Sequence, residues 1–257
     1  MRRALPALLL TLSIAACGGE NAREELIDAA NRTASQEGLR AQLDGEIRVE
    51  GASAPLPVSA TAVVAQGGQR TRSTADLSAV QGRDVPAGPQ EVITVGEDVY
   101  VRSPALLSLR GKDVDEEWIK FDAQAREQTG LGAGPAGLGS GDPTEVLASL
   151  GKTAGDVEEV GQESVRGAET THYRTTVDLT GIQGAQKQGV GTTIPTEVWV
   201  GEDGLVRRLR QQVPFSNAGQ TGEVRFTLEY FDFGVEESIE PPPEDDVVSA
   251  EQAFREP

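Results

Sequence analysis

Apolar and polar residues alternate along several separate segments of this chain, and this alternation most limits what it can fold into. In the stretch 223–230, Val224, Phe226, Leu228 and Tyr230 share one parity, and charged or hydroxyl residues hold the other. Successive side chains of a β-strand point to opposite faces, so the pattern predicts a strand with one apolar and one solvated face. Such a strand has to join a sheet whose apolar face is covered.

The same alternation recurs along most of the chain. In the stretch 43–49, Leu43, Ile47 and Val49 share one parity with Gly45. Further strands are predicted at 58–65, 69–76, 92–95, 99–102, 118–121, 157–165, 169–179, 198–200 and 205–213. Several are joined by short turns that contain glycine and acidic residues, which favours antiparallel hairpins. The sequence therefore predicts about ten or eleven antiparallel strands.

Two segments predict helices. Residues 22–37 place Leu26, Ala29, Ala30 and Thr33 on one stripe, which is typical of an amphipathic helix. A second helix is expected at 143–151, with Asp142 as its N-cap and Gly151 at its end. The glycine- and alanine-rich stretch 123–143 before it predicts a mobile loop. These elements together indicate an α+β fold with two or three helices.

The N-terminus predicts export and lipidation. Arg2 and Arg3 precede an uncharged apolar run at 4–16. As a helix this run extends roughly 20 Å, too short for a bilayer core of about 30 Å, so residues 1–16 are expected to be a signal peptide. Small residues stand before Cys17 in the pattern of a bacterial lipobox. We expect Cys17 to carry a lipid anchor on the outer face of the bacterial cell membrane; the alternative is an ordinary secretory signal.

Charge and composition exclude several classes of function. The net charge of −18 repels phosphate backbones, so we expect no nucleic-acid partner. One cysteine and one histidine cannot build a zinc site, and we expect no metal and no cofactor. The stretch 132–137, GAGPAG, follows no apolar strand and is interrupted by a proline, so it predicts no dinucleotide site. His172 is expected to be structural or on the surface. We expect no enzyme and no catalytic residue.

Three late motifs carry a family resemblance. They are the strand with Gly167, Thr170, His172 and Tyr173, the hairpin residues 197–199, and the stretch 230–234, YFDFG. With the lipobox and the early helix, the chain resembles the actinobacterial LppX/LprA/LprF/LprG-type lipoproteins, whose fold is related to that of LolA carriers. The resemblance implies a strongly curved antiparallel sheet, a half-barrel, with helices packed on its concave face around an apolar cavity.

The resemblance also implies a domain division and a function. We expect the lipoprotein domain at 17–240 and a disordered C-terminal tail at 241–257, because PPPEDD opens that stretch. The expected cargo is an acylated lipid or glycolipid, which the protein would bind and transfer across the envelope. Candidate cavity-lining residues are Leu43, Ile47, Val49, Leu205, Leu209, Val224, Phe226 and Leu228. Their alternative role is ordinary core packing. The alternative function is an anchored, non-catalytic interaction module with an envelope protein partner.

Overall fold

The computed structural model describes residues 19–76, 78–79, 86, 88–109, 116–129, 142–178, 193–217 and 220–254. The predicted signal peptide, Cys17 and the glycine-rich stretch 130–141 lie outside the described residues.

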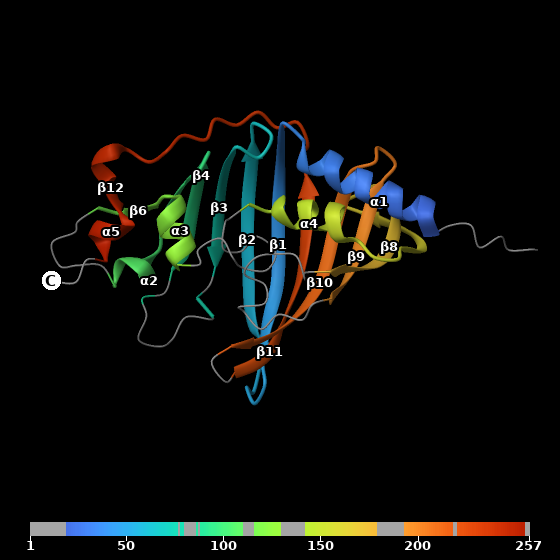
Figure 1. The fold of residues 1–257 in the computed structure, drawn as a ribbon, viewed down its shortest axis with the longest axis horizontal. Helices are drawn as coiled ribbons and strands as arrows, with labels where there is room; N and C mark the ends of the chain where they lie inside the picture. The colour runs from blue at the N-terminus through green and yellow to red at the C-terminus, as the bar shows by residue number, and fades with distance from the viewer. Residues whose placement is uncertain are drawn as a thin grey trace, which may run out of the picture.

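Within these ranges the chain forms one sheet of twelve strands, as the alternation predicts (Figure 1). The first six strands are β1 (Gly38–Val49), β2 (Leu56–Ala65), β3 (Arg70–Asp76), β4 (Pro89–Val95), β5 (Asp98–Arg102) and β6 (Trp118–Phe121). The others are β7 (Glu158–Val165), β8 (Ala168–Asp178), β9 (Thr193–Gly201), β10 (Val206–Asn217), β11 (Gln220–Phe231) and β12 (Val247–Ser249).

The sheet consists of two antiparallel meanders joined at its centre. Its order is β12-β6-β5-β4-β3-β2-β1-β11-β10-β9-β8-β7. Strands β1 to β6 run outward on one side, β7 to β11 run inward on the other, and β1 pairs antiparallel with β11. The sheet is strongly curved and does not close, which confirms the expected fold class. The sheet has one strand more than expected, because the tail contributes β12.

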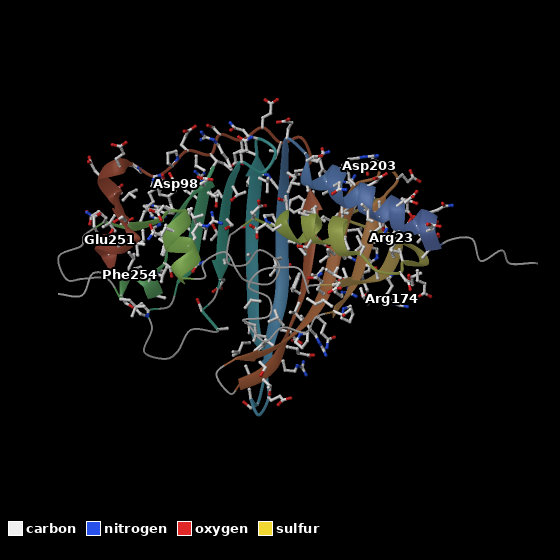
Figure 2. All side chains as sticks on the ribbon, in the orientation of Figure 1. Arg23, Asp98, Arg174, Asp203, Glu251 and Phe254 are labelled. Atoms are coloured by element: carbon white, nitrogen blue, oxygen red, sulfur yellow. The ribbon has the colours of Figure 1, made fainter. Side chains whose placement is uncertain are left out.

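The helices pack on one face, which we call the inner face. Helix α1 (Gly19–Ala34) and helix α4 (Glu145–Thr153) lie across the half of the sheet that holds β7 to β11 (Figure 1). Their apolar side chains share a core with inner-face residues of β8 to β11 and of β1 and β2. Arg23 of α1, labelled in Figure 2, donates a hydrogen bond to the carbonyl of Ala154 after α4.

Helix α4 differs from its predicted boundaries. It begins at Glu145, two residues later than expected, because the Asp142 side chain accepts hydrogen bonds from the backbone and hydroxyl of Thr144. It also continues past Gly151, where a Cβ atom would lie 2.6 Å from the Asn31 side chain of α1. Gly151 therefore serves the close packing of α4 against α1, and not the end of the helix.

A second core lies at the other side of the sheet. It joins inner-face residues of β4 to β6 with α2 (Pro104–Leu107), α3 (Ala123–Thr129), β12 and α5 (Ala250–Ala253). Helix α3 occupies the first part of the stretch predicted as a loop at 123–143. None of the helices in the described ranges combines the length and the hydropathy that a bilayer span requires.

The C-terminal stretch is ordered over 241–254, where the sequence predicts a disordered tail at 241–257, and residues 255–257 lie outside the described residues. Residues 232–246 cross the upper edge of the sheet in Figure 1, on the face opposite the helices. We call them the crossing segment. Arg40 and Arg70 bind its residues Glu237 and Ile239, and β12 then pairs parallel with β6. A capping box between Ser249 and Gln252 opens α5. Prolines suit an extended crossing, so PPPEDD does not prevent order here.

Ile239 anchors the crossing segment and provides a test of its role. Its side chain is 1% exposed, in a cluster that includes Ile93, Tyr100 and Trp118. Ile239→Ala should lower the free energy of unfolding by about 2–5 kcal/mol, because it leaves a cavity in this cluster. Urea denaturation measures the effect. Ser238→Ala, at the exposed neighbouring position, is the control; an Ile239→Ala loss no larger than that of the control would show that the segment is not anchored there.

Candidate functional site on the inner face of the sheet

Five of the predicted lining residues lie in the main core. Leu43, Leu209, Val224, Phe226 and Leu228 are each at most 7% exposed and belong to the cluster that includes α1 and α4. Cross-strand pairing aligns Leu43 with Leu228 and Leu228 with Leu209, so they form one inner-face row. The structure brings this set together as the parity predicts, and their role as a cavity lining stays a prediction.

The other three predicted lining residues lie at the border of the main core or outside it. Ile47 and Val49 are half-buried on β1, and Ile47 packs against the main core. Leu205 precedes β10 and belongs to the turn after β9, so its predicted strand position is wrong. A register shift between Val206 and Arg208 changes the parity at the start of β10, and Val206 takes the buried inner-face position.

Short side chains line the inner face between the two cores. Strand β2 presents Ala60 and Ala62 there, and β3 presents Thr71, Ser73 and Ala75. Cross-strand pairs align Ala60 with Ala75 and Ala62 with Ser73. We call these five residues the short-side-chain strip. The strip does not follow from large apolar residues on one parity, because its residues are small; the run RTRSTAD is the sequence signal that indicates it.

The strip lies between the regions of closest helix packing. Helices α1 and α4 contact β7, β8 and β10, whereas α3 and α5 contact β6 and β12. Ala60 and Ala62 border the first core and Val92 on β4 belongs to the second. The short side chains of the strip take up less volume than the large apolar residues of the two cores on either side, and Thr71 and Ser73 are nonetheless only 0% and 7% exposed.

One polar atom of the strip lacks a partner. The Thr71 hydroxyl is buried and makes no hydrogen bond, and Thr71 as a whole is 0% exposed. A buried hydroxyl without a partner costs about 1–3 kcal/mol, so natural proteins seldom retain one without a reason. A ligand that enters the strip with an ester or hydroxyl oxygen would satisfy it.

The described residues offer little for catalysis or metal binding. Within the described ranges, no three histidine, cysteine or carboxylate residues are grouped as metal ligands. His172 lies on the outer face, the face opposite the helices, where its ring stacks on Trp199 at 4.1 Å between centroids. It is 6% exposed, with Nδ1 3.3 Å from Glu163. His172 is therefore a buried structural residue, as expected.

Glu229 on β11 connects β10 and the β7–β8 turn on the outer face. Its carboxylate accepts hydrogen bonds from Arg208 on β10 and from Arg166 in the β7–β8 turn. Burial acts to raise the pKa of Glu229, but the two guanidinium groups outweigh it and hold the pKa below its usual range. Arg166 also donates a hydrogen bond to Gln42 on β1, so these contacts hold the β7–β8 turn against the outer face of β1 and β11.

Comparison with known proteins gives limited sequence likeness. No family model matches this chain. It is 26% identical over 159 residues to an uncharacterized 31.2 kDa protein of Streptomyces griseus, covering 54% of this chain and 50% of that protein. It is 34% identical over 131 residues to a candidate lipoprotein of Streptomyces coelicolor, covering 49% of this chain and 40% of that protein. The chain thus matches half or less of the length of these curated relatives.

The structural likeness is more extensive. The crystal structure of LprF from Mycobacterium bovis superposes with a TM-score of 0.52 at 15% identity, covering 86% of this chain and 97% of that one. The chain has the LprF fold. The expected resemblance to the LppX/LprA/LprF/LprG-type lipoproteins is thereby confirmed for the fold. In the LprF fold of this chain, the short-side-chain strip lies on the helix-covered face.

The Glu229 cluster predicts a pH dependence of stability. The lowered pKa of Glu229 means that its stabilising contribution is present above pH 4.5 and is lost as the pH falls through its lower folded-state pKa. Glu229→Gln should therefore cost about 1–3 kcal/mol of unfolding free energy at pH 7. The cost should be much smaller at pH values far below 4.5. Chemical denaturation across this pH range measures it. Glu202→Gln in the exposed β9–β10 turn is the control; a cost independent of pH would contradict the assignment.

Proposed function

We propose that this chain is an exported lipoprotein that holds the acyl chains of a lipid or glycolipid on the inner face of its sheet. The observation that carries the proposal is the short-side-chain strip between two helix-packed apolar cores. The LprF fold supports it, and so does the likeness to a candidate lipoprotein of Streptomyces coelicolor. No catalytic role is part of the proposal.

The energetics favour a sheltered site for such a cargo. Each methylene group exposed to water costs about 0.8 kcal/mol, so an acyl chain of about sixteen carbons costs on the order of 12 kcal/mol. Apolar walls on both sides of the strip would recover much of this cost. Leu43 and Ile47 on β1 and Val92 on β4 provide such walls beside it. The unpartnered Thr71 hydroxyl would bind an ester or headgroup oxygen of the lipid.

The membrane anchor completes the proposed role. Cys17 would carry the acyl anchor, two residues before the start of α1 at Gly19. Two or more acyl chains hold a protein stably on a bilayer, so the protein would remain at the outer face of the cell membrane. There it would take lipid from the bilayer and pass it to another envelope component. A short tether keeps the inner face near its source of lipid.

A pair of neighbouring substitutions tests the site. Ala75→Phe places a ring in the strip, whereas Thr74→Phe places the same ring on the exposed outer face of β3. Ala75→Phe should weaken binding of a fluorescent long-chain fatty-acid probe by about tenfold or more, because it occupies the space of the acyl chain. Thr74→Phe should stay within about twofold of the unsubstituted protein. Fluorescence titration measures both.

Thermal unfolding of each variant accompanies the titration, so that loss of the fold is not mistaken for loss of the site. Equal probe binding by folded Ala75→Phe and Thr74→Phe variants would refute a site on the strip. Absence of probe binding in the unsubstituted protein would favour the interaction module instead. In that case, crosslinking in the envelope should recover a protein partner.

A further inference from the structure

The outer face of the sheet has an arginine-lined depression that the proposed lipid site does not use. Its volume is about 290 Å³. The lining residues are Arg174, Pro195, Thr196, Glu197, Arg210, Gln211, Gln212 and Arg225. We call it the arginine depression. It lies on β8 to β11, on the opposite face from the short-side-chain strip, and Figure 2 labels Arg174 on its β8 side.

The sheet register explains why this depression exists. Arg174 pairs with Glu197 and Glu197 with Arg210, so long side chains from three adjacent strands share one outer-face row. In the next row, Pro195 presents a short, rigid side chain at the centre. Arg225 on β11 closes the far side of the depression. Long, flexible side chains therefore surround the short side chain of Pro195 at the bottom of the depression.

The arginines of the depression each have a carboxylate partner. Its lining has three arginines and one glutamate, and the neighbouring Glu158 and Glu223 make the cluster neutral overall, within a protein of net charge −18. Each arginine forms an ion pair with a glutamate: Arg174 with Glu158, Arg210 with Glu197 and Arg225 with Glu223. All three guanidinium groups are about half exposed, so these pairs contribute little and exchange readily.

The donor geometry suits a phosphate group. In each of these ion pairs the contact is made by one terminal nitrogen of the guanidinium. A guanidinium has five N–H donors in a planar fork, which matches the oxygens of phosphate. Three such forks around one depression can therefore bind a tetrahedral anion from several sides.

Two aromatic side chains lie next to the depression. Trp199 and His172 occupy the adjacent outer-face row and are almost fully buried. Trp199 Nε1 has no hydrogen-bond partner, and His172 Nε2 makes no hydrogen bond but lies 3.7 Å from the Glu197 carboxylate. The Arg210 guanidinium lies 5.2 Å from the Trp199 ring, a cation–π contact that restrains its position at the rim. The rim is thus partly preorganised.

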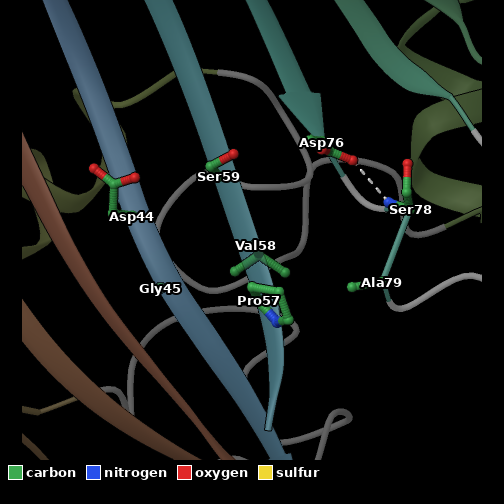
Figure 3. A pocket seen from close by; sticks show the side chains of 8 residues that line it. All are labelled: Asp44, Gly45, Pro57, Val58, Ser59, Asp76, Ser78 and Ala79. Carbon is green, nitrogen blue, oxygen red and sulfur yellow. Dashed lines mark hydrogen bonds between the residues drawn. The ribbon is translucent and has the colours of Figure 1, made fainter.

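A second outer-face depression would confine an anion to the arginine side. It has a volume of about 320 Å³ and is lined by Asp44, Ser59 and Asp76 together with Pro57 and Ser78 (Figure 3). The Arg174–Glu197–Arg210 row continues through Thr227 to this acidic depression. An anion therefore meets guanidinium donors at one end of the row and carboxylates, which repel it, at the other.

We propose that the arginine depression binds a phosphate group, from an anionic lipid headgroup or from a soluble phosphorylated molecule. The site is independent of the lipid strip, and either can fail without the other. Inorganic phosphate and phosphatidylglycerol vesicles are the probes that distinguish the two sources.

The first arm of the test uses the full chain with Cys17→Ser, which cannot be acylated. Inorganic phosphate is titrated at constant ionic strength, and backbone amide chemical shifts are followed by NMR. Amides of β8 to β11 should shift and saturate. Arg225→Gln should weaken the apparent affinity by about tenfold, because it removes one charged fork without disturbing the Trp199 contact. Arg72→Gln, on the exposed outer face of β3, is the matched control and should leave affinity within about twofold.

The second arm measures co-sedimentation with vesicles of phosphatidylglycerol or phosphatidylcholine. Retention on phosphatidylglycerol that inorganic phosphate competes away identifies a headgroup source, because the chain's negative charge otherwise opposes such binding. Phosphate binding without vesicle retention identifies a soluble source. The proposal is overturned if the β8 to β11 amides do not saturate with phosphate, or if Arg72→Gln and Arg225→Gln weaken binding equally.

Discussion

The pairing of β1 with β11 is the contact on which the rest of the sheet depends. These strands join two meanders that are otherwise built from local hairpins, and their register runs from Arg40–Phe231 to Val49–Gly222. A Cβ atom at Gly45 would lie 2.6 Å from the Arg225 carbonyl oxygen, and one at Gly222 would lie 2.3 Å from that of Arg48. Because both obstacles are backbone atoms, no side-chain rotation could relieve them, and glycine is required for this close approach.

The single wide sheet has an inner face that the helices cover only in part. Helices α1 and α4 cover β7 to β11, and α3 and α5 cover the far side near β6 and β12. Between them, part of β2 and β3 presents alanine, serine and threonine, although Val58 and Val64 of β2 also face inward. The proposed lipid function rests on this distribution. The outer face carries the compensating polar rows, including both charged depressions.

Much of the fold could be predicted from the sequence, because alternation is a local property. The expected strand at 118–121 matches β6, and the one at 69–76 differs from β3 by a single residue. Non-local features could not be predicted in this way. Ile239 and Val248 anchor the tail against distant strands, although its prolines and acidic residues are typical of disorder. Leu205 was misplaced because a register shift changes parity without a mark in the sequence.

The site was less predictable than the fold. Parity identifies which residues face inward, but it does not show whether they meet helices or empty space. Leu209 and Phe226 prove to be packed in the main core, whereas Ala62 and Ser73 mark the strip. The arginine depression depends on the register of four strands, which brings together residues from 174 to 225. No linear spacing shows that arrangement.

The most direct test of the lipid proposal is mass spectrometry of an organic extract. The Cys17→Ser chain would be made in an actinobacterial host, so that native lipids are present and the covalent anchor is not counted. The account predicts acyl lipids in near-stoichiometric amounts in extracts of the folded, extensively washed protein. Repeated absence of acyl species, together with a crystal structure in which side chains fill the space above Ala62 and Ser73, would contradict it.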